Sequence, residues 1–233
     1  MALFTLIIPT EGYSENSSLS LQQLPPGGPS MDRFSDQSST AGGSLDEGRL
    51  RGGSGDPVAG KDKADMCSGC HGEDGNSIDA ATPKLAGQYG AYIAKQVRDY
   101  QDSLRSHQMM DSIATSISDE DLADISAYFA TRPMMKGDIP SKNRTGKKLF
   151  ENDDLSRMIV RCSSCHGVYG KGQNPRNSMF PVIGGQHKEY LLGQLLRFKK
   201  GDLHNSPNGV MNISVRGLSD AELEALADYI SGL

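Results

Sequence analysis

Two copies of one five-residue pattern contain every cysteine of this 233-residue chain. They read Cys67-Ser68-Gly69-Cys70-His71 and Cys162-Ser163-Ser164-Cys165-His166. The Cys-x-x-Cys-His spacing is that of a covalent attachment site for c-type haem. Two thiols on one helical turn reach the two vinyl groups of a porphyrin, and the adjacent histidine then lies under the iron as its axial ligand. The sequence therefore predicts two covalently bound haem c groups with four thioether anchors (Cys67, Cys70, Cys162, Cys165) and two iron ligands (His71, His166).

Other uses of paired cysteines fit less well. A structural zinc site places its two Cys-x-x-Cys pairs about 15–20 residues apart, whereas about 90 residues separate the pairs here. A thioredoxin-like redox pair occurs once, near a βαβ unit. Two unrelated disulfides would not each be followed by His-Gly. Haem attachment is the interpretation that uses every cysteine.

The chain repeats itself from Asp56 onward, which indicates a tandem duplication. The cysteine motif recurs at an offset of 95 residues, the block 83–88 recurs as 181–186 at an offset of 98, and the block 118–122 recurs as 219–223 at an offset of 101. The order of the blocks is the same in both copies, and the drift in offset is what loop insertions produce. Each unit is small for an independent core and would gain stability from an internal cofactor.

The repeat also predicts the second axial ligand, which in cytochromes c is typically methionine. Counting back eight residues from Ser118 reaches Met110, and counting back eight from Ser219 reaches Met211. Met109 is the alternative in the first unit. Methionine also fills cores without any ligand role, but the shared register favours Met110 and Met211 as ligands.

The remaining histidines have no matched positions that would make them ligands. His107 is near Met110 and could form a bis-histidine iron, but the second unit has no counterpart, since His204 lies seven residues before Met211. We expect His107, His187 and His204 to be surface residues or to support the site indirectly. Each axial histidine needs an acceptor for its other ring nitrogen. The backbone carbonyls of Pro83 and Pro181 are candidates, although either could be a simple turn proline.

The segments that must position these groups are helical in pattern. Apolar residues recur at helical spacing over 89–104 and 190–198. Ser118 and Ser219 are predicted helix N-caps with acidic residues in the first turn. No alternating strand pattern of useful length appears, so we predict an all-α fold with two tandem domains, at 56–135 and 143–233, joined by a Pro/Gly linker at 136–142.

Residues 1–55 differ in composition from the rest, with nine Gly, ten Ser, four Pro and no Lys. We expect an extension or linker, because such a segment has little apolar surface to offset chain entropy. Its short apolar start lacks the basic region of a secretory signal. The alternative is an arm that holds the protein in a stable complex with a partner.

Composition and charge exclude several classes. No apolar run approaches the roughly 20 residues that cross a bilayer, and a net charge of −5 argues against a nucleic-acid binder. Residues 56–140 carry a net charge of −6 and residues 141–233 carry +4. We expect this asymmetry to orient redox partners, unless the charges are merely solvated surface.

These residues together resemble the dihaem cytochrome c4 family over about residues 54–233. The haem motifs are shared by all c-type cytochromes, while the blocks at 83–88 and 181–186 and the two-unit layout are more particular to that family. The resemblance implies two class I cytochrome c domains, each with one haem ligated by His and Met, and it supports the prolines as carbonyl acceptors. The second unit departs from the first at 168–172, and residues 1–55 have no counterpart.

Three functions are compatible with this pattern, in order of preference. The first is a periplasmic electron carrier, not an enzyme, that passes single electrons between respiratory redox partners, some of them membrane complexes, towards a terminal oxidase. The second is the haem-bearing subunit of a multi-chain oxidoreductase, such as a flavocytochrome sulfide dehydrogenase or an alcohol dehydrogenase. The third is a dihaem enzyme, which would need an open axial position and is disfavoured by Met in both units. The periplasmic location is expected from the export that covalent haem attachment requires.

Overall fold

A computed structural model describes residues 53–173 and 180–233 of the chain. The predicted extension, residues 1–55, lies outside the described residues except for its last three. The first repeat is defined as residues 56–135 and the second repeat as residues 143–233.

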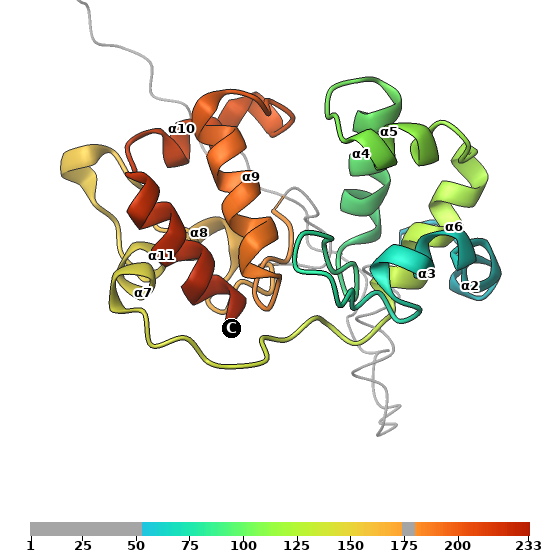
Figure 1. The fold of residues 1–233 in the computed structure, drawn as a ribbon, viewed down its shortest axis with the longest axis horizontal. Coiled ribbons are helices and arrows are strands. Elements are labelled where there is room, and N and C mark those ends of the chain that lie inside the picture. The colour runs from blue at the N-terminus through green and yellow to red at the C-terminus, as the bar shows by residue number, and fades with distance from the viewer. Residues whose placement is uncertain (1–52, 174–179) are drawn as a thin grey trace, which may run out of the picture. The chain divides into compact units, whose positions relative to one another are not determined.

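Helices make up the regular structure of both repeats (Figure 1). Those of the first repeat are α2 (Pro57–Lys63), α3 (Asp65–His71), α4 (Gly90–Gln101), α5 (Gln108–Ala114) and α6 (Asp119–Ala130). Those of the second are α7 (Arg144–Glu151), η1 (Leu155–Arg157), α8 (Ser163–His166), α9 (Lys188–Lys200), η2 (Pro207–Gly209), α10 (Val210–Arg216) and α11 (Asp220–Ser231). Within the described ranges the only β-pairing is an isolated bridge between Asp154 and Ile159. The predicted all-α fold is confirmed.

None of the helices in the described ranges is long and apolar enough to span a membrane.

The same packing occurs twice. Helix α6 contacts α2 and α4, and α4 also contacts α5; in the second repeat α11 contacts α7 and α9, and α9 contacts α10. Glycine permits both terminal-helix crossings. A Cβ on Gly60 of α2 would lie 2.0 Å from the Asp124 carbonyl oxygen of α6, and a Cβ on Gly146 of α7 would lie 2.0 Å from the Ala225 carbonyl oxygen of α11. The two backbones therefore approach more closely than any side chain would allow.

Serine caps open the last helix of each repeat, as predicted. The Ser118 hydroxyl accepts a hydrogen bond from the Asp121 N–H at the start of α6. The Ser219 hydroxyl accepts one from the Glu222 N–H, and the Glu222 carboxylate accepts from the Ser219 N–H in return. These caps satisfy backbone donors that the first helical turn leaves unpaired.

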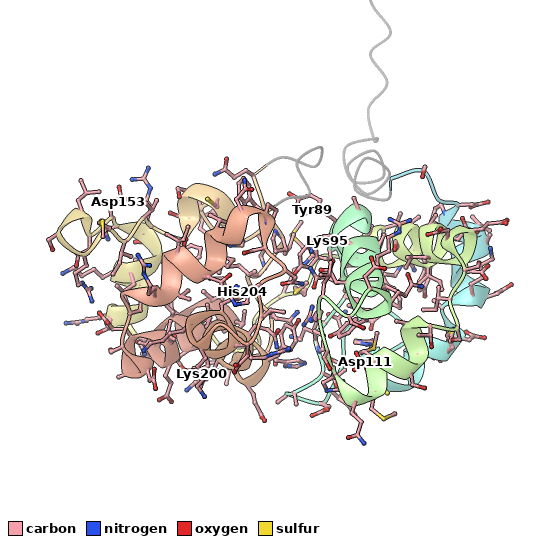
Figure 2. All side chains as sticks on the ribbon, turned by 90° about the horizontal axis from the view of Figure 1, so that it is seen from above. Tyr89, Lys95, Asp111, Asp153, Lys200 and His204 are labelled. Carbon is pink, nitrogen blue, oxygen red and sulfur yellow. The ribbon has the colours of Figure 1, made fainter. Side chains whose placement is uncertain are left out.

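Hydrogen bonds join the two repeats along α4. The Lys95 ammonium donates to the Asn205 carbonyl at 2.7 Å, and the Asn205 side chain donates to the carboxylate of Asp99 at 2.7 Å. Figure 2 labels Lys95 on this helix. His187, at the start of α9, has its Nε2 atom 2.9 Å from both the hydroxyl and the carbonyl oxygen of Ser77. Residues about 110 positions apart in the sequence are thus fixed against each other.

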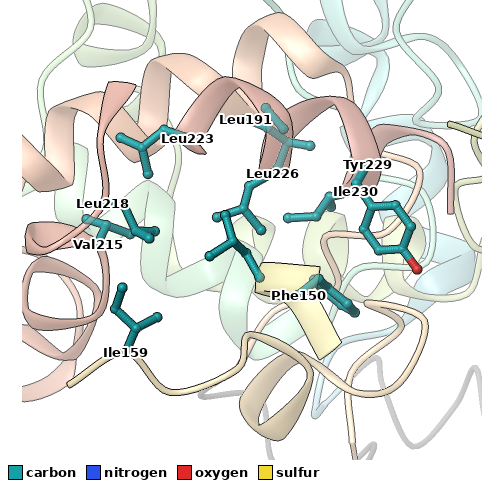
Figure 3. Close-up of a cluster of buried hydrophobic side chains, with 11 residues drawn as sticks. Phe150, Ile159, Leu191, Val215, Leu218, Leu223, Leu226, Tyr229 and Ile230 are labelled. Atoms are coloured by element: carbon teal, nitrogen blue, oxygen red, sulfur yellow. The ribbon is translucent and has the colours of Figure 1, made fainter. Parts of the chain in front are cut away.

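Each repeat has its own apolar core. In the second repeat the core gathers around the terminal helices α7 and α11 (Figure 3) and includes Phe150, Leu223, Leu226 and Ile230. The first repeat buries the matching positions of α4 and α6. A third, small cluster of Tyr89, Met135 and Val182 takes residues from both repeats.

The segment that joins the repeats has no helix between α6 and α7. Met135, the last residue of the first repeat, is fully buried. The Met135 N–H donates to the Ala86 carbonyl at 3.1 Å, and the Gly137 N–H donates to the Leu233 carbonyl at 3.0 Å. The Lys84 ammonium donates to the Lys136 carbonyl at 3.2 Å. The predicted linker is therefore held against both repeats at its start.

Candidate functional site

The first motif lies on α3, so that Cys67, Cys70 and His71 share one short helix. His71 is buried, and its Nδ1 atom lies 2.8 Å from the Pro83 carbonyl oxygen. Burial lowers the pKa of His71, although the bond to Pro83 opposes this. A neutral ring that donates from Nδ1 to a carbonyl keeps a lone pair on Nε2, which is the atom an iron would bind.

The second motif has the same arrangement. Cys162 caps α8 and His166 ends it. His166 is buried, burial lowers its pKa, and its Nδ1 atom lies 2.9 Å from the Pro181 carbonyl oxygen. The carbonyls of Pro83 and Pro181 therefore lie where acceptors were expected from the sequence.

A glycine ends each motif helix for a conformational reason. Gly72 and Gly167 have φ of 82° and 81°, in a region that side chains rarely allow. Their N–H groups donate to the carbonyls of Ser68 and Ser163 at 2.9 and 3.0 Å. The chain can then turn away from each histidine at once and reach the proline whose carbonyl accepts a hydrogen bond from the Nδ1–H of that histidine.

The first cysteine of each motif is a poor thiolate. Burial raises the pKa of Cys67 and of Cys162 to about 11. Reactive redox cysteines show the opposite, a pKa lowered by helix dipoles or nearby cations. These environments disfavour a thioredoxin-like use of the motifs and suit thiols that end as neutral thioethers.

The first motif opens onto a cavity of about 420 Å³. Cys67, Cys70, His71 and Met110 all line it, and so does Met109. Met110 is half-buried, whereas Met109 is 60% exposed at the start of the same helix, α5. The first cavity thus brings together the predicted anchors and ligands of the first haem, and both methionines line the wall of this cavity.

The second repeat has a cavity of about 150 Å³. His166, Pro181 and Met211 line this cavity, while Cys162 and Cys165 do not. Met211 lies on α10 and packs against the core of the second repeat. Met110 on α5 and Met211 on α10 thus each line the cavity that also holds the axial histidine of their own repeat.

Both sites fit a haem by the chemistry of their donors. Each cavity is lined by an imidazole whose Nδ1 is bonded to a proline carbonyl and by a thioether on another helix, and the first is lined by two neighbouring thiols as well. The cavity walls are otherwise largely apolar, which suits a porphyrin face.

The other three histidines take no part in these donor sets. His107 precedes α5 and is exposed at the rim of the first cavity. His204 is exposed in the second repeat (Figure 2). His187 contacts Ser77 of the other repeat, and its position in the sequence did not predict this contact between the repeats.

Two glutamines of the repeated block have contacts that the sequence did not predict. Gln88 donates to the Val182 carbonyl at 2.8 Å and accepts from the Val182 N–H at 3.0 Å. Gln186 does the same with Lys84, at 2.9 Å in both directions. The only sequence signal for these contacts was that a glutamine ends both blocks. This recurrence does not indicate that each glutamine side chain bonds the other repeat.

Comparison with known proteins identifies the family. The family model described as cytochrome c matches twice, at residues 58–132 and 144–233. Cytochrome c4 of Pseudomonas aeruginosa is 39% identical over 181 residues, which is 77% of this chain and 89% of that protein. The crystal structure of reduced cytochrome c4 from Pseudomonas stutzeri superposes with a TM-score of 0.73 at 35% identity and covers 77% of this chain and all of that chain.

A further relative has a more specific name. The thiosulfate dehydrogenase electron acceptor of Stutzerimonas stutzeri is 33% identical over 172 residues, which is 72% of this chain and 78% of that protein.

The predicted resemblance to cytochrome c4 is confirmed, and with two matched domains the chain carries two covalently bound haem c groups. By these matches and by the two equivalent His–carbonyl sites, the chain belongs to the cytochrome c family, as a dihaem electron carrier of the cytochrome c4 type.

Proposed function

We propose that the chain carries single electrons through two haems that are both closed by His and Met, His71 with Met110 and His166 with Met211, towards a respiratory terminal oxidase. The haem irons supply the one-electron redox chemistry when bound. The domain boundaries 56–135 and 143–233 and the periplasmic location are part of this proposal. The observation that supports this proposal is the equivalence of the two sites. Each has an axial histidine, a proline carbonyl and a methionine, in the same order along the chain.

In this proposal the side chains hold the haems and tune their reduction potentials, and they form no bonds with a substrate. The cysteines fix each porphyrin to a helix, and the proline carbonyls keep the imidazole tautomer and orientation. A methionine ligand raises the reduction potential relative to a second histidine. Such potentials suit delivery of electrons to a strong acceptor.

The delivery step is testable with the holoprotein. Reduced protein mixed with respiratory membranes that contain a terminal oxidase should be reoxidised only when oxygen is present, and both haems should reoxidise. Membranes without the oxidase are the control. Protein that stays reduced with active membranes contradicts delivery to an oxidase.

One observation favours a second assignment. The relative named as a thiosulfate dehydrogenase electron acceptor is 33% identical to this chain. In that assignment the chain takes electrons from a partner oxidoreductase, as a carrier or as its haem-bearing subunit. Reduction of the holoprotein by purified thiosulfate dehydrogenase with thiosulfate supports the carrier form, and copurification with a larger catalytic chain supports the subunit form.

A further inference from the structure

Each axial histidine bonds a peptide group whose other end is bonded by the opposite repeat. The Nδ1 atom of His71 lies 2.8 Å from the Pro83 carbonyl oxygen. The N–H of the same peptide group belongs to Lys84, and it donates to the side-chain oxygen of Gln186 at 2.9 Å. Because this peptide bond is trans, its C=O and its N–H point in opposite directions. A continuous chain of hydrogen bonds thus leads from His71 of the first repeat, through one peptide group, to a glutamine of the second.

The second repeat contains the same chain of hydrogen bonds with the repeats exchanged. The Nδ1 atom of His166 lies 2.9 Å from the Pro181 carbonyl oxygen. The N–H of that peptide group belongs to Val182, and it donates to the side-chain oxygen of Gln88 at 3.0 Å. Each axial histidine is therefore connected to a glutamine of the other repeat.

Both glutamines are held in one orientation. Each is only 5% exposed. The amide nitrogen of Gln186 donates to the Lys84 carbonyl at 2.9 Å, and that of Gln88 donates to the Val182 carbonyl at 2.8 Å. The side-chain oxygen of each glutamine also accepts from the backbone N–H of the residue that follows it, at 3.0 Å. These contacts keep the amide oxygen directed at the peptide group of the other repeat.

A hydrogen bond at one end of a peptide group strengthens the hydrogen bond at its other end. When the N–H donates, electron density moves towards the carbonyl oxygen, which becomes a better acceptor, and this cooperativity is greatest in a low-dielectric interior. A better acceptor for the Nδ1–H makes the imidazole more basic at Nε2, the atom that binds iron. A more basic axial ligand favours the ferric state, so it lowers the reduction potential of the haem.

We propose that Gln186 and Gln88 are positioning residues that tune the haem of the opposite repeat, Gln186 through His71 and Gln88 through His166. This inference rests on the proposed function, because it needs an iron bound at each histidine. The glutamine that acts on each histidine is supplied by the other repeat, so both reduction potentials depend on the contact between the repeats.

Redox titration of the holoprotein tests the proposal with a crossed pair of variants, in which methionine keeps the side-chain length and removes the amide. In Q186M we expect the ferrous-to-ferric ratio of the first haem, at a fixed applied potential, to rise about threefold, which corresponds to a fraction of the free energy of one hydrogen bond. The ratio of the second haem should stay the same. In Q88M the second haem should change in this way and the first should not.

The matched control is Q101M, which should change neither haem. Gln101 is a half-buried glutamine on α4, it donates to the carbonyls of Ala114 and Ile117 in its own repeat, and it lines neither cavity.

Proton NMR of the reduced holoprotein provides a readout that a merely structural role would not move. In Q186M the Nδ1–H resonance of His71 should move to lower frequency, because its hydrogen bond weakens, while the Nδ1–H resonance of His166 stays in place. Q88M should give the reverse. Q186E supplies a stronger, charged acceptor, so it should move the resonance of His71 to higher frequency.

Unchanged potentials in both methionine variants overturn the proposal, and a change confined to the haem of the mutated repeat overturns the crossed assignment. A changed potential with an unmoved Nδ1–H resonance overturns the route through the peptide group. If the methionine variants do not mature, Q186E and Q88E decide, since an unmoved resonance of the opposite histidine overturns the proposal. The optical band of Met-ligated ferric haem, recorded on the wild-type protein, tests the ligand assignment separately, so failure of the two proposals can be told apart.

Discussion

At the scale of the residue, each axial histidine depends on a partner that is not itself a ligand. The imidazoles of His71 and His166 each place Nδ1 within 2.9 Å of a proline carbonyl. This part of the site was predictable, because motif, glycine and proline loop lie close together in the sequence. The hydrogen bonds from Arg105 to Tyr190 and Gln194 were not predictable, because they come from packing one repeat on the other.

The choice between Met109 and Met110 makes a sharp prediction. In M110A the first haem should lose the long-wavelength band of Met-ligated ferric haem, so that its intensity per chain falls by about half, and the reduced protein should bind carbon monoxide at one haem. M109A, altered at a more exposed side chain of the same helix, should keep the full band. The reverse result would assign the ligand to Met109.

At the scale of the element, the long helices were predicted well and the first helix of each repeat was missed. The apolar period over 89–104 and 190–198 matches α4 (Gly90–Gln101) and α9 (Lys188–Lys200). Helix α2 has no such period, because its buried contact residue is Gly60. A glycine at a close helix crossing leaves no hydrophobic signal in the sequence.

The crossing of α7 and α11 predicts a cost for any side chain at Gly146. We expect G146A to lower the free energy of unfolding by about 1–3 kcal/mol, the usual range for overpacking. The matched control is G193A on α9, where a Cβ meets nothing within 4 Å and where alanine should add roughly 0.5–1 kcal/mol. Denaturant unfolding of the holoproteins measures both. Equal stability of the two variants contradicts the close crossing.

The loop around η1 makes a prediction about acid stability. Hydrogen bonds from Ser156 and Arg157 lower the pKa of Asp154 from 3.8 to about 2. A carboxyl with a lowered folded pKa contributes stability that is present above its unfolded pKa, about 3.8, and is lost as the pH falls towards 2. Unfolding measured across this range should therefore depend less on pH in D154N than in the wild-type protein. An unchanged pH profile in D154N contradicts the role of Asp154.

At the scale of the whole molecule, reciprocal contacts relate the two repeats. Gln88 and Gln186 each bond the backbone of the other repeat in both directions. Lys84 and Lys171 donate from their ammonium groups to the carbonyls of Lys136 and Met135, where the joining segment begins. The duplication could be read from the sequence, but these contacts could not, because they depend on which surfaces the repeats present to each other.

The opposite net charges of residues 56–140 and 141–233 predict that the electron donor and acceptor respond differently to salt. Association rates of the two partners should change with ionic strength with different slopes, because exposed charges are screened over about 10 Å at 0.1 M salt. E120Q and K200Q, at exposed positions on the first and second repeat, should each alter the slope for one partner only. Equal slopes for both partners contradict a role for the charge asymmetry.

The central claim is that both haems are closed by His and Met. Its most direct test is the absorption spectrum of the oxidised wild-type holoprotein, with carbon monoxide then added to the reduced form at neutral pH. Closure of both irons predicts a Met–ferric band with the intensity of two haems per chain and no carbon monoxide binding. A band for one haem only, or carbon monoxide bound at either haem, would contradict it.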